Sequence, residues 1–259
     1  MAAINDLNIL LAMDNLLIVW KKLSLTLIFI SFTFLHSFAT WSIIILDPET
    51  KEIGIAGASC SYNCYGIGEI LPGKGAIIVQ AMSNNKARSK GLQMLASDAS
   101  PEEIIKVLCD PKFDPENQQY AVLSFMHLDQ PKSYTGKSAA DHKGSMASWG
   151  ISVQGNILTN ENEIKIIYEA ALKAKEKKLS VEEILITALK AGSKAGGDQR
   201  CGAQKATSAF ITVAKPGDKP KHFYLDLVVS GQRKGGDNAV ELLRAKYDLW
   251  KSGSSVNRN

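Results

Sequence analysis

A threonine that follows a predicted cleavage site is the residue best suited to chemistry in this chain. Thr40 comes directly after Ala39 in the stretch LHSFATWS, between an apolar run and a β-branched run. A cut between these two residues makes threonine the first residue of the mature chain. A terminal threonine combines a nucleophilic hydroxyl with a base, its own α-amino group. We therefore expect Thr40 to act as a nucleophile and the rest of the chain to position it.

The first 39 residues resemble a secretory signal peptide. Two lysines precede an apolar run over residues 23–38, and the small residues Ser37 and Ala39 occupy the −3 and −1 positions of the cut. Met1 and Met13 are both possible starts. We expect signal peptidase to mature an exported protein, periplasmic or extracellular. The alternative is an uncleaved membrane anchor, although about 16 apolar residues are fewer than the roughly 20 that a spanning helix needs.

The composition indicates one globular domain and argues against nucleic-acid binding. The chain has 259 residues, of which 45% are hydrophobic and 22% charged, so it is long enough for a large core. We expect the domain to span residues 40–251, with a disordered tail over residues 252–259. The net charge is only +4, and lysines alternate with acidic residues. No basic stripe with interleaved aromatic residues marks a nucleic-acid surface.

The four cysteines, at positions 60, 64, 109 and 201, all follow the predicted cut. An even number in an exported chain predicts up to two disulfides, and their spacing leaves Cys60–Cys64 and Cys60–Cys201 equally open. Four buried thiols are the alternative. The histidines of the mature chain do not have a metal-ligand spacing relative to these cysteines, so we expect no metal and no other cofactor.

Hydrophobic patterning predicts strands and helices that do not alternate regularly. Strands are expected over residues 40–46, 53–59, 75–81, 120–128, 132–135, 149–155, 208–214 and 223–229, and a loop over residues 66–75. Helices are expected over residues 85–97 and 101–108, after caps at Asn160 and Ser180, and from about residue 237. This order excludes a doubly wound parallel sheet. It fits an α+β fold with two sheets face to face and helices on both outer sides.

Two familiar catalytic motifs are absent from the sequence. Residues 68–75, GEILPGKG, have the spacing of a phosphate loop, but Gly75 replaces the magnesium-binding Ser or Thr and a strand follows it. No GxSxG elbow is present to support a serine triad. Four polar clusters remain, at residues 83–85, 141–142, 154–156 and 196–200. Each alone is typical of turns, whereas together they offer amide donors for an oxyanion and a charged pair.

Several segments resemble a bacterial family catalogued as domain of unknown function 1028. They are TWSIIILDPETKEIGIAGAS, ISVQGNIL, AGGDQRCGAQKATSAFITV and YLDLVVS, and the resemblance covers nearly all of residues 40–250. That family is similar in fold to the N-terminal nucleophile (Ntn) hydrolases. The resemblance implies a four-layer αββα sandwich in which the first residue of the mature chain is the nucleophile.

The resemblance places Thr40 at the family's amino-terminal position and implies that His142, Gln154, Asn156, Asp198 and Arg200 lie near the active end of the sandwich. We expect a catalytic set of Thr40, His142, Asn156, Asp198 and Arg200, and a substrate-binding set of Ser59, Gln80, Asn84 and Gln154. Asn156 and nearby backbone N–H groups are expected to stabilise the oxyanion, while Asp198 and Arg200 hold the amine. Relatives often have Gly where this chain has Cys201, so a disulfide from Cys201 to Cys60 is implied as a feature of this lineage.

The leading hypothesis is an exported amidohydrolase that cleaves a C–N bond in a small-molecule or peptide amide. The second is a non-catalytic exported domain that binds a ligand or serves as a scaffold. A membrane-tethered form that retains residues 1–39 is a third, and a homo-oligomer is compatible with each of them.

Overall fold

The structure is a computed structural model that describes residues 40–140 and 142–253. These residues fall within one contact unit, Ser37–Asn259. The predicted signal peptide, Asp141 and most of the predicted tail (residues 254–259) lie outside the described residues. No helix of the described part is both long and apolar enough to cross a membrane.

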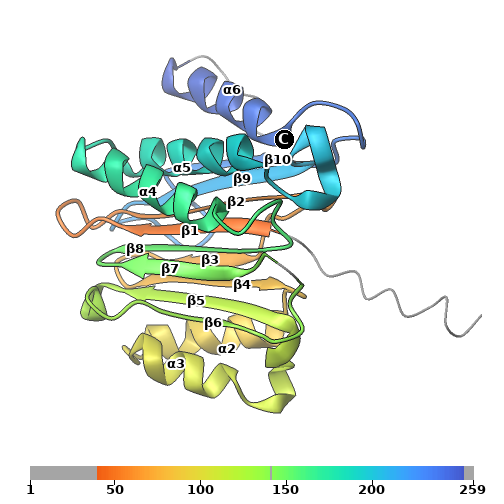
Figure 1. Cartoon of the computed structure of the whole chain (residues 1–259). Helices are drawn as coiled ribbons and strands as arrows, with labels where there is room; N and C mark the ends of the chain where they lie inside the picture. The colour runs from red at the N-terminus through yellow and green to blue at the C-terminus, as the bar shows by residue number, and fades with distance from the viewer. Residues whose placement is uncertain (1–39, 141, 254–259) are drawn as a thin grey trace, which may run out of the picture. The chain divides into compact units, whose positions relative to one another are not determined.

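Six antiparallel strands form the larger sheet, in the order β10-β9-β2-β1-β8-β7 (Figure 1). They are β1 (Thr40–Leu46), β2 (Ile53–Ser59), β7 (Gly144–Ser148), β8 (Ile151–Asn156), β9 (Ser208–Ala214) and β10 (Leu225–Val229). Strand β1 lies inside this sheet, paired with β2 and β8, and all seven of its residues are buried. Its β-branched run suits a strand that is covered on both faces.

The smaller sheet has the antiparallel order β3-β4-β5-β6. Its strands are β3 (Gly68–Leu71), β4 (Gly75–Ala81), β5 (Gln118–Ser124) and β6 (Lys132–Thr135). The helices are α2 (Asn85–Ala96), α3 (Pro101–Leu108), α4 (Glu163–Glu176), α5 (Val181–Ala195) and α6 (Ala239–Lys251). Short 3₁₀ segments cover Pro111–Phe113, Pro115–Asn117, Phe125–His127 and Gln199–Gln204.

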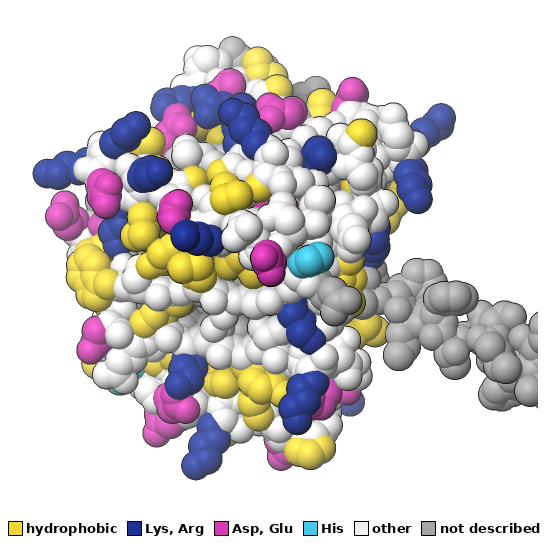
Figure 2. Space-filling model, viewed as in Figure 1, with side chains coloured by type: hydrophobic (Ala, Val, Ile, Leu, Met, Phe, Trp, Pro, Cys, Tyr) yellow, Lys and Arg dark blue, Asp and Glu magenta, His cyan; other side chains and the backbone are white. Residues whose placement is uncertain are grey.

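Three apolar cores hold these elements together. One lies between the larger sheet and helices α4, α5 and α6, the second between the two sheets, and the third between the smaller sheet and helices α2 and α3 (Figure 1). The predicted combination of two sheets with helices is therefore confirmed, and every strand pairing in both sheets is antiparallel. On the face drawn in Figure 2, basic and acidic side chains are interspersed.

Local signals explain several element ends. Ser100 and Glu103 form a capping box at the start of α3, and Gly196 ends α5 with a φ of 146°. The predicted cap at Asn160 is wrong, because Asn162 precedes α4 and the Asn160 amide donates instead to the carbonyl of Ala195 (2.9 Å).

The structure differs from the predicted loops and strands in three places. The loop expected over residues 66–75 contains β3, a short strand with only one fully buried residue. Strand β7 was not predicted, because its sequence GSMAS has no apolar alternation and its side chains are half-buried or exposed. The strand expected over residues 120–128 ends at Ser124, whose hydroxyl accepts from Met126 N (3.2 Å) and starts a 3₁₀ turn.

Candidate active site around Thr40

Thr40 begins β1, between the ends of two neighbouring strands. It pairs with Ser59 of β2 on one side and with Asn156 of β8 on the other, and it is 1% exposed. Alternation along β1 turns Thr40 to the same face as Ile44 and Leu46, which belong to the core between the sheets. The Thr40 side chain therefore faces the space between the two sheets.

That space is apolar at one end and polar at the end where Thr40 lies. Six fully buried side chains form the polar end, which we call the polar layer: Ser42, Gln80, Gln119, Ser152, Gln154 and Asn156. An unpaired buried amide or hydroxyl costs about 1–3 kcal/mol, so such a layer is stable only when its groups bond to one another.

Hydrogen bonds join the polar layer to the backbone of Thr40. Gln154 Nε2 donates to Ser42 Oγ (2.7 Å), and this hydroxyl donates to Gln80 Oε1 (2.5 Å). Gln80 Nε2 donates to Gln119 Oε1 (2.6 Å) and to the Thr40 carbonyl (3.3 Å). Gln80 and Gln154, two of the four predicted substrate contacts, thus have protein partners, and Gln80 bonds directly to the Thr40 carbonyl.

Asn156 has an acceptor atom without a donor. Its Nδ2 donates to Gln119 Oε1 (3.3 Å), while Gln119 Nε2 donates to one hydroxyl and two carbonyl oxygens at 2.9–3.0 Å. These contacts fix the orientation of both amides. Asn156 Oδ1 is left buried with no hydrogen-bond partner among the described residues. It belongs to the residue directly opposite Thr40 on β8.

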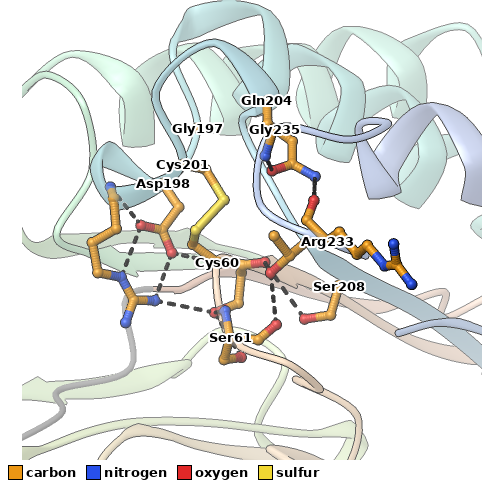
Figure 3. Close-up of a disulfide and its surroundings, with 12 residues drawn as sticks. Cys60, Ser61, Gly197, Asp198, Cys201, Gln204, Ser208, Arg233 and Gly235 are labelled. Carbon is orange, nitrogen blue, oxygen red and sulfur yellow. Dashed lines mark hydrogen bonds and ion pairs between the residues drawn. A yellow bond between two sulfur atoms is a disulfide. The ribbon is translucent and has the colours of Figure 1, made fainter. Parts of the chain in front are cut away.

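Asp198 and Arg200 form a tight pair beyond the start of β1, where Asp198 also forms a β-bridge with Leu158, two residues after Asn156. Asp198 is fully buried and accepts from Arg200 Nη2 (2.7 Å), Nε (3.1 Å) and N (3.0 Å), and from Cys60 N (2.6 Å), as Figure 3 shows in part. Arg200 Nη2 also donates to Ser59 Oγ (3.5 Å). The pair therefore reaches Thr40 through Ser59, its neighbour on β2.

A disulfide fixes this pair to the end of β2. Cys60 and Cys201 are bonded, with their Cα atoms 5.6 Å apart, as the family resemblance implied (Figure 3). Cys64 and Cys109 are free thiols. Burial raises the pKa of Cys64 to about 12, so this thiol stays protonated and is a poor nucleophile near neutral pH.

Two predicted site residues have hydrogen-bond partners outside the polar layer and the charged pair. The Asn84 side chain accepts from the N–H groups of Lys86 and Ala87 and caps α2. His142 has an exposed side chain, and its carbonyl accepts from Leu158 N (3.4 Å). No described hydrogen bond brings the His142 imidazole to Thr40, so its catalytic role stays a prediction.

A cavity of about 210 Å³ opens beside Thr40. It is lined by Thr40, Ser61, Asn63, Cys64, Tyr65, Gly66, Ile67, Ala81, Ser83, Asn85 and Arg88. The sequence pointed to this region only through the polar cluster at residues 83–85, and it gave no signal for Arg88. Within the described part of the chain, no three His, Cys, Asp or Glu side chains gather as metal ligands do.

Comparison with known proteins places the chain in a family. A model described as "Family of unknown function (DUF1028)" matches residues 40–238. The chain belongs to this family. The crystal structure of another DUF1028 protein, SPO2555 from Silicibacter pomeroyi, matches with a TM-score of 0.69 and 24% identity, over 85% of this chain and 91% of that one. Among curated proteins no match was found. The DUF1028 match begins at Thr40, the residue around which the site is built.

Proposed function

We propose that this DUF1028 protein is an exported Ntn amidohydrolase in which Thr40 is both nucleophile and base. The architecture supports a four-layer αββα sandwich, because helices cover the outer face of each sheet and an apolar core fills the space between the sheets. The candidate nucleophile lies at the start of an inner strand. A cavity lies next to it, so a substrate has access to a residue that is otherwise buried.

The observation that carries the proposal is the lone acceptor of Asn156. Its Oδ1 is buried without a donor, on the residue directly opposite Thr40. Such an atom is costly unless a donor is supplied. Cleavage before Thr40 converts a peptide nitrogen with one N–H into an α-amino group with two or three, and so adds donors at the position opposite Asn156. The acceptor thus fits the processed chain better than the unprocessed one.

The chemistry then needs only groups of this chain and water. Thr40 Oγ attacks the amide carbonyl while the α-amine, with an ordinary pKa of about 7.7–8.0, takes the hydroxyl proton. The resulting ammonium returns that proton to the leaving nitrogen as the C–N bond breaks. A water molecule then attacks the acyl ester and gives one proton to the amine. The ammonium passes this proton to Thr40 Oγ as the ester C–O bond breaks, which releases the carboxylic acid and restores Thr40 with a neutral amine.

Neighbouring side chains position these reacting groups. Asn156 Nδ2 has a second N–H besides the one given to Gln119, and we assign this N–H to the oxyanion. Removal of such a donor typically lowers the rate by about 10²–10³-fold. Arg200 bonds to Ser59, the β2 partner of Thr40, and Asp198 bridges Leu158, two residues after Asn156, so the charged pair lies at the ends of both strands that flank Thr40.

Two features support export to the periplasm or the extracellular space. The sequence before Thr40 has the parts of a signal peptide. The Cys60–Cys201 disulfide is of a kind that persists in oxidising compartments. Signal peptidase would then expose the amine that the mechanism needs.

A set of three variants tests the proposal. The full chain is expressed, and the purified protein is screened against N-acyl amino acids and simple acyl amides. Thr40→Ala should lose at least about 10³-fold of the rate, and Thr40→Ser should retain part of it because it keeps a hydroxyl. Thr50→Ala, at an exposed threonine in the turn after β1, is the control. Equal activity of Thr40→Ala and wild type would favour the alternative of an exported ligand-binding or scaffold domain.

A further inference from the structure

Arg88 is the only charged residue that lines the cavity beside Thr40 in the described part of the chain. The other lining residues are apolar side chains, glycine, hydroxyls, an amide and a thiol, together with Asn85 next to Arg88. A single cation in an otherwise neutral cavity gives that cavity a positive potential. The cavity therefore favours a ligand with a negative group.

The guanidinium of Arg88 lies in the cavity wall. Its Nη2 donates to Asn85 Oδ1 (2.5 Å) and its Nη1 to Ser83 Oγ (3.4 Å), and both partners line the cavity themselves. The Arg88 side chain is 11% exposed, so it is shielded from most bulk water. Two of its five N–H groups have no described partner, which leaves donors for a planar anion.

Glu69 compensates this charge only weakly. Its Oε1 lies 3.5 Å from Arg88 Nε, and its side chain is 43% exposed on β3. Ion pairs of such length and exposure contribute little, because water and salt screen them. Glu69 is also absent from the cavity lining, so it does not occupy the place that a ligand anion would take.

We infer that Arg88 binds a carboxylate of the substrate, and that the substrates are small amides carrying a free carboxylate close to the scissile bond. The inference rests on the proposed function, because only that function places the scissile bond at Thr40. A guanidinium binds carboxylate with two parallel hydrogen bonds. A volume of about 210 Å³ lies below the roughly 300–1,000 Å³ of pockets for drug-sized ligands, which limits the substrate to a small molecule or a chain end.

Binding to the Thr40→Ala protein tests this inference apart from catalysis. Calorimetry compares each carboxylate with its neutral carboxamide: N-acetyl amino acids carry the charge on the amine half, and succinamate carries it on the acyl half. At least one carboxylate should bind about 10–100-fold more tightly than its neutral partner. A ratio below threefold in both pairs, including no detectable binding, would overturn the inference.

Variants assign any preference to Arg88. In the Thr40→Ala background, Arg88→Gln should lower the ratio of carboxylate to carboxamide affinity to about 1. Arg88→Lys should keep part of the preference for the carboxylate, because a cation remains. Glu69→Gln is the matched control and should leave the ratio equal or larger. A ratio unchanged in a folded Arg88→Gln protein would contradict the assignment. If the Thr40→Ala protein prefers the carboxylate but the wild-type protein hydrolyses none of the amides, the proposed function is refuted while the inference on Arg88 stands.

Discussion

Glu163 is the first residue of α4, and its carboxyl is fully buried. Both of its oxygens lack a hydrogen-bond partner among the described residues. Burial, with a smaller contribution from the charge of Asp198, raises the pKa of Glu163 from 4.5 to about 8. The folded protein therefore keeps a proton that the unfolded chain releases above about pH 4.5. The contribution of Glu163 to stability is therefore fully present below pH 4.5 and is lost as the pH rises towards 8.

The size of this effect follows from the two pKa values. Each pKa unit corresponds to about 1.4 kcal/mol, so the carboxyl lowers the free energy of unfolding by about 3 kcal/mol between pH 5 and pH 8. Glu163→Gln keeps the shape of the protonated side chain and cannot ionise. We expect its stability advantage over wild type to grow by about 3 kcal/mol over this range.

Urea unfolding followed by tryptophan fluorescence at pH 5, 6, 7 and 8 measures that difference. The matched control is Glu161→Gln, which removes a charge from an exposed position two residues earlier. The difference in free energy of unfolding between Glu161→Gln and wild type should vary much less with pH. If the free energies of unfolding of Glu163→Gln and wild type differ by the same amount at every pH from 5 to 8, the buried carboxyl does not titrate as we describe.

Three further predictions concern stability. Replacing both Cys60 and Cys201 by serine should lower the free energy of unfolding by about 2–5 kcal/mol, because the disulfide closes a long loop; unchanged urea midpoints would contradict this. Arg200→Ala leaves the buried Asp198 without its cation and should lower the free energy of unfolding by about 2–3 kcal/mol. Urea denaturation at low and high salt checks this, because salt screens surface ion pairs and should change the loss little for a buried pair. Gly192→Ala should lower the melting temperature, because a Cβ there would lie 2.7 Å from Trp41 Nε1. Gly253→Ala is the control, because a Cβ at that position would meet no atom within 4 Å and so cause no steric clash.

The strands with the strongest apolar runs could be predicted to the residue. Residues 40–46, 53–59, 75–81 and 208–214 are strands as expected, since apolar or β-branched runs end at turn residues or small polar ones. Strand β7 carries no such signal because it lies at an edge of its sheet, where its side chains need not be apolar. Edge strands are defined by their neighbours more than by their own composition.

The sequence drew attention to polar residues at strand ends, but not to the way in which they are arranged around Thr40. Thr40, Asn156 and Asp198 stood out as reactive or polar positions, yet only strand pairing shows that Asn156 lies opposite Thr40. The bond from Cys60 N to Asp198 spans 138 positions, a distance that sequence spacing does not encode. Arg88 reads as a surface residue of an amphipathic helix, and only the packing of α2 against β4 brings it to the cavity.

The N-terminal residue of the protein made by expressing cells tests the central claim most directly. Intact-mass analysis combined with N-terminal sequencing should find a chain that begins at Thr40 with an unmodified α-amine. A chain that begins at Met1 or Met13, or one whose Thr40 nitrogen is acylated, would contradict the account, because the proposed base would then be a peptide nitrogen.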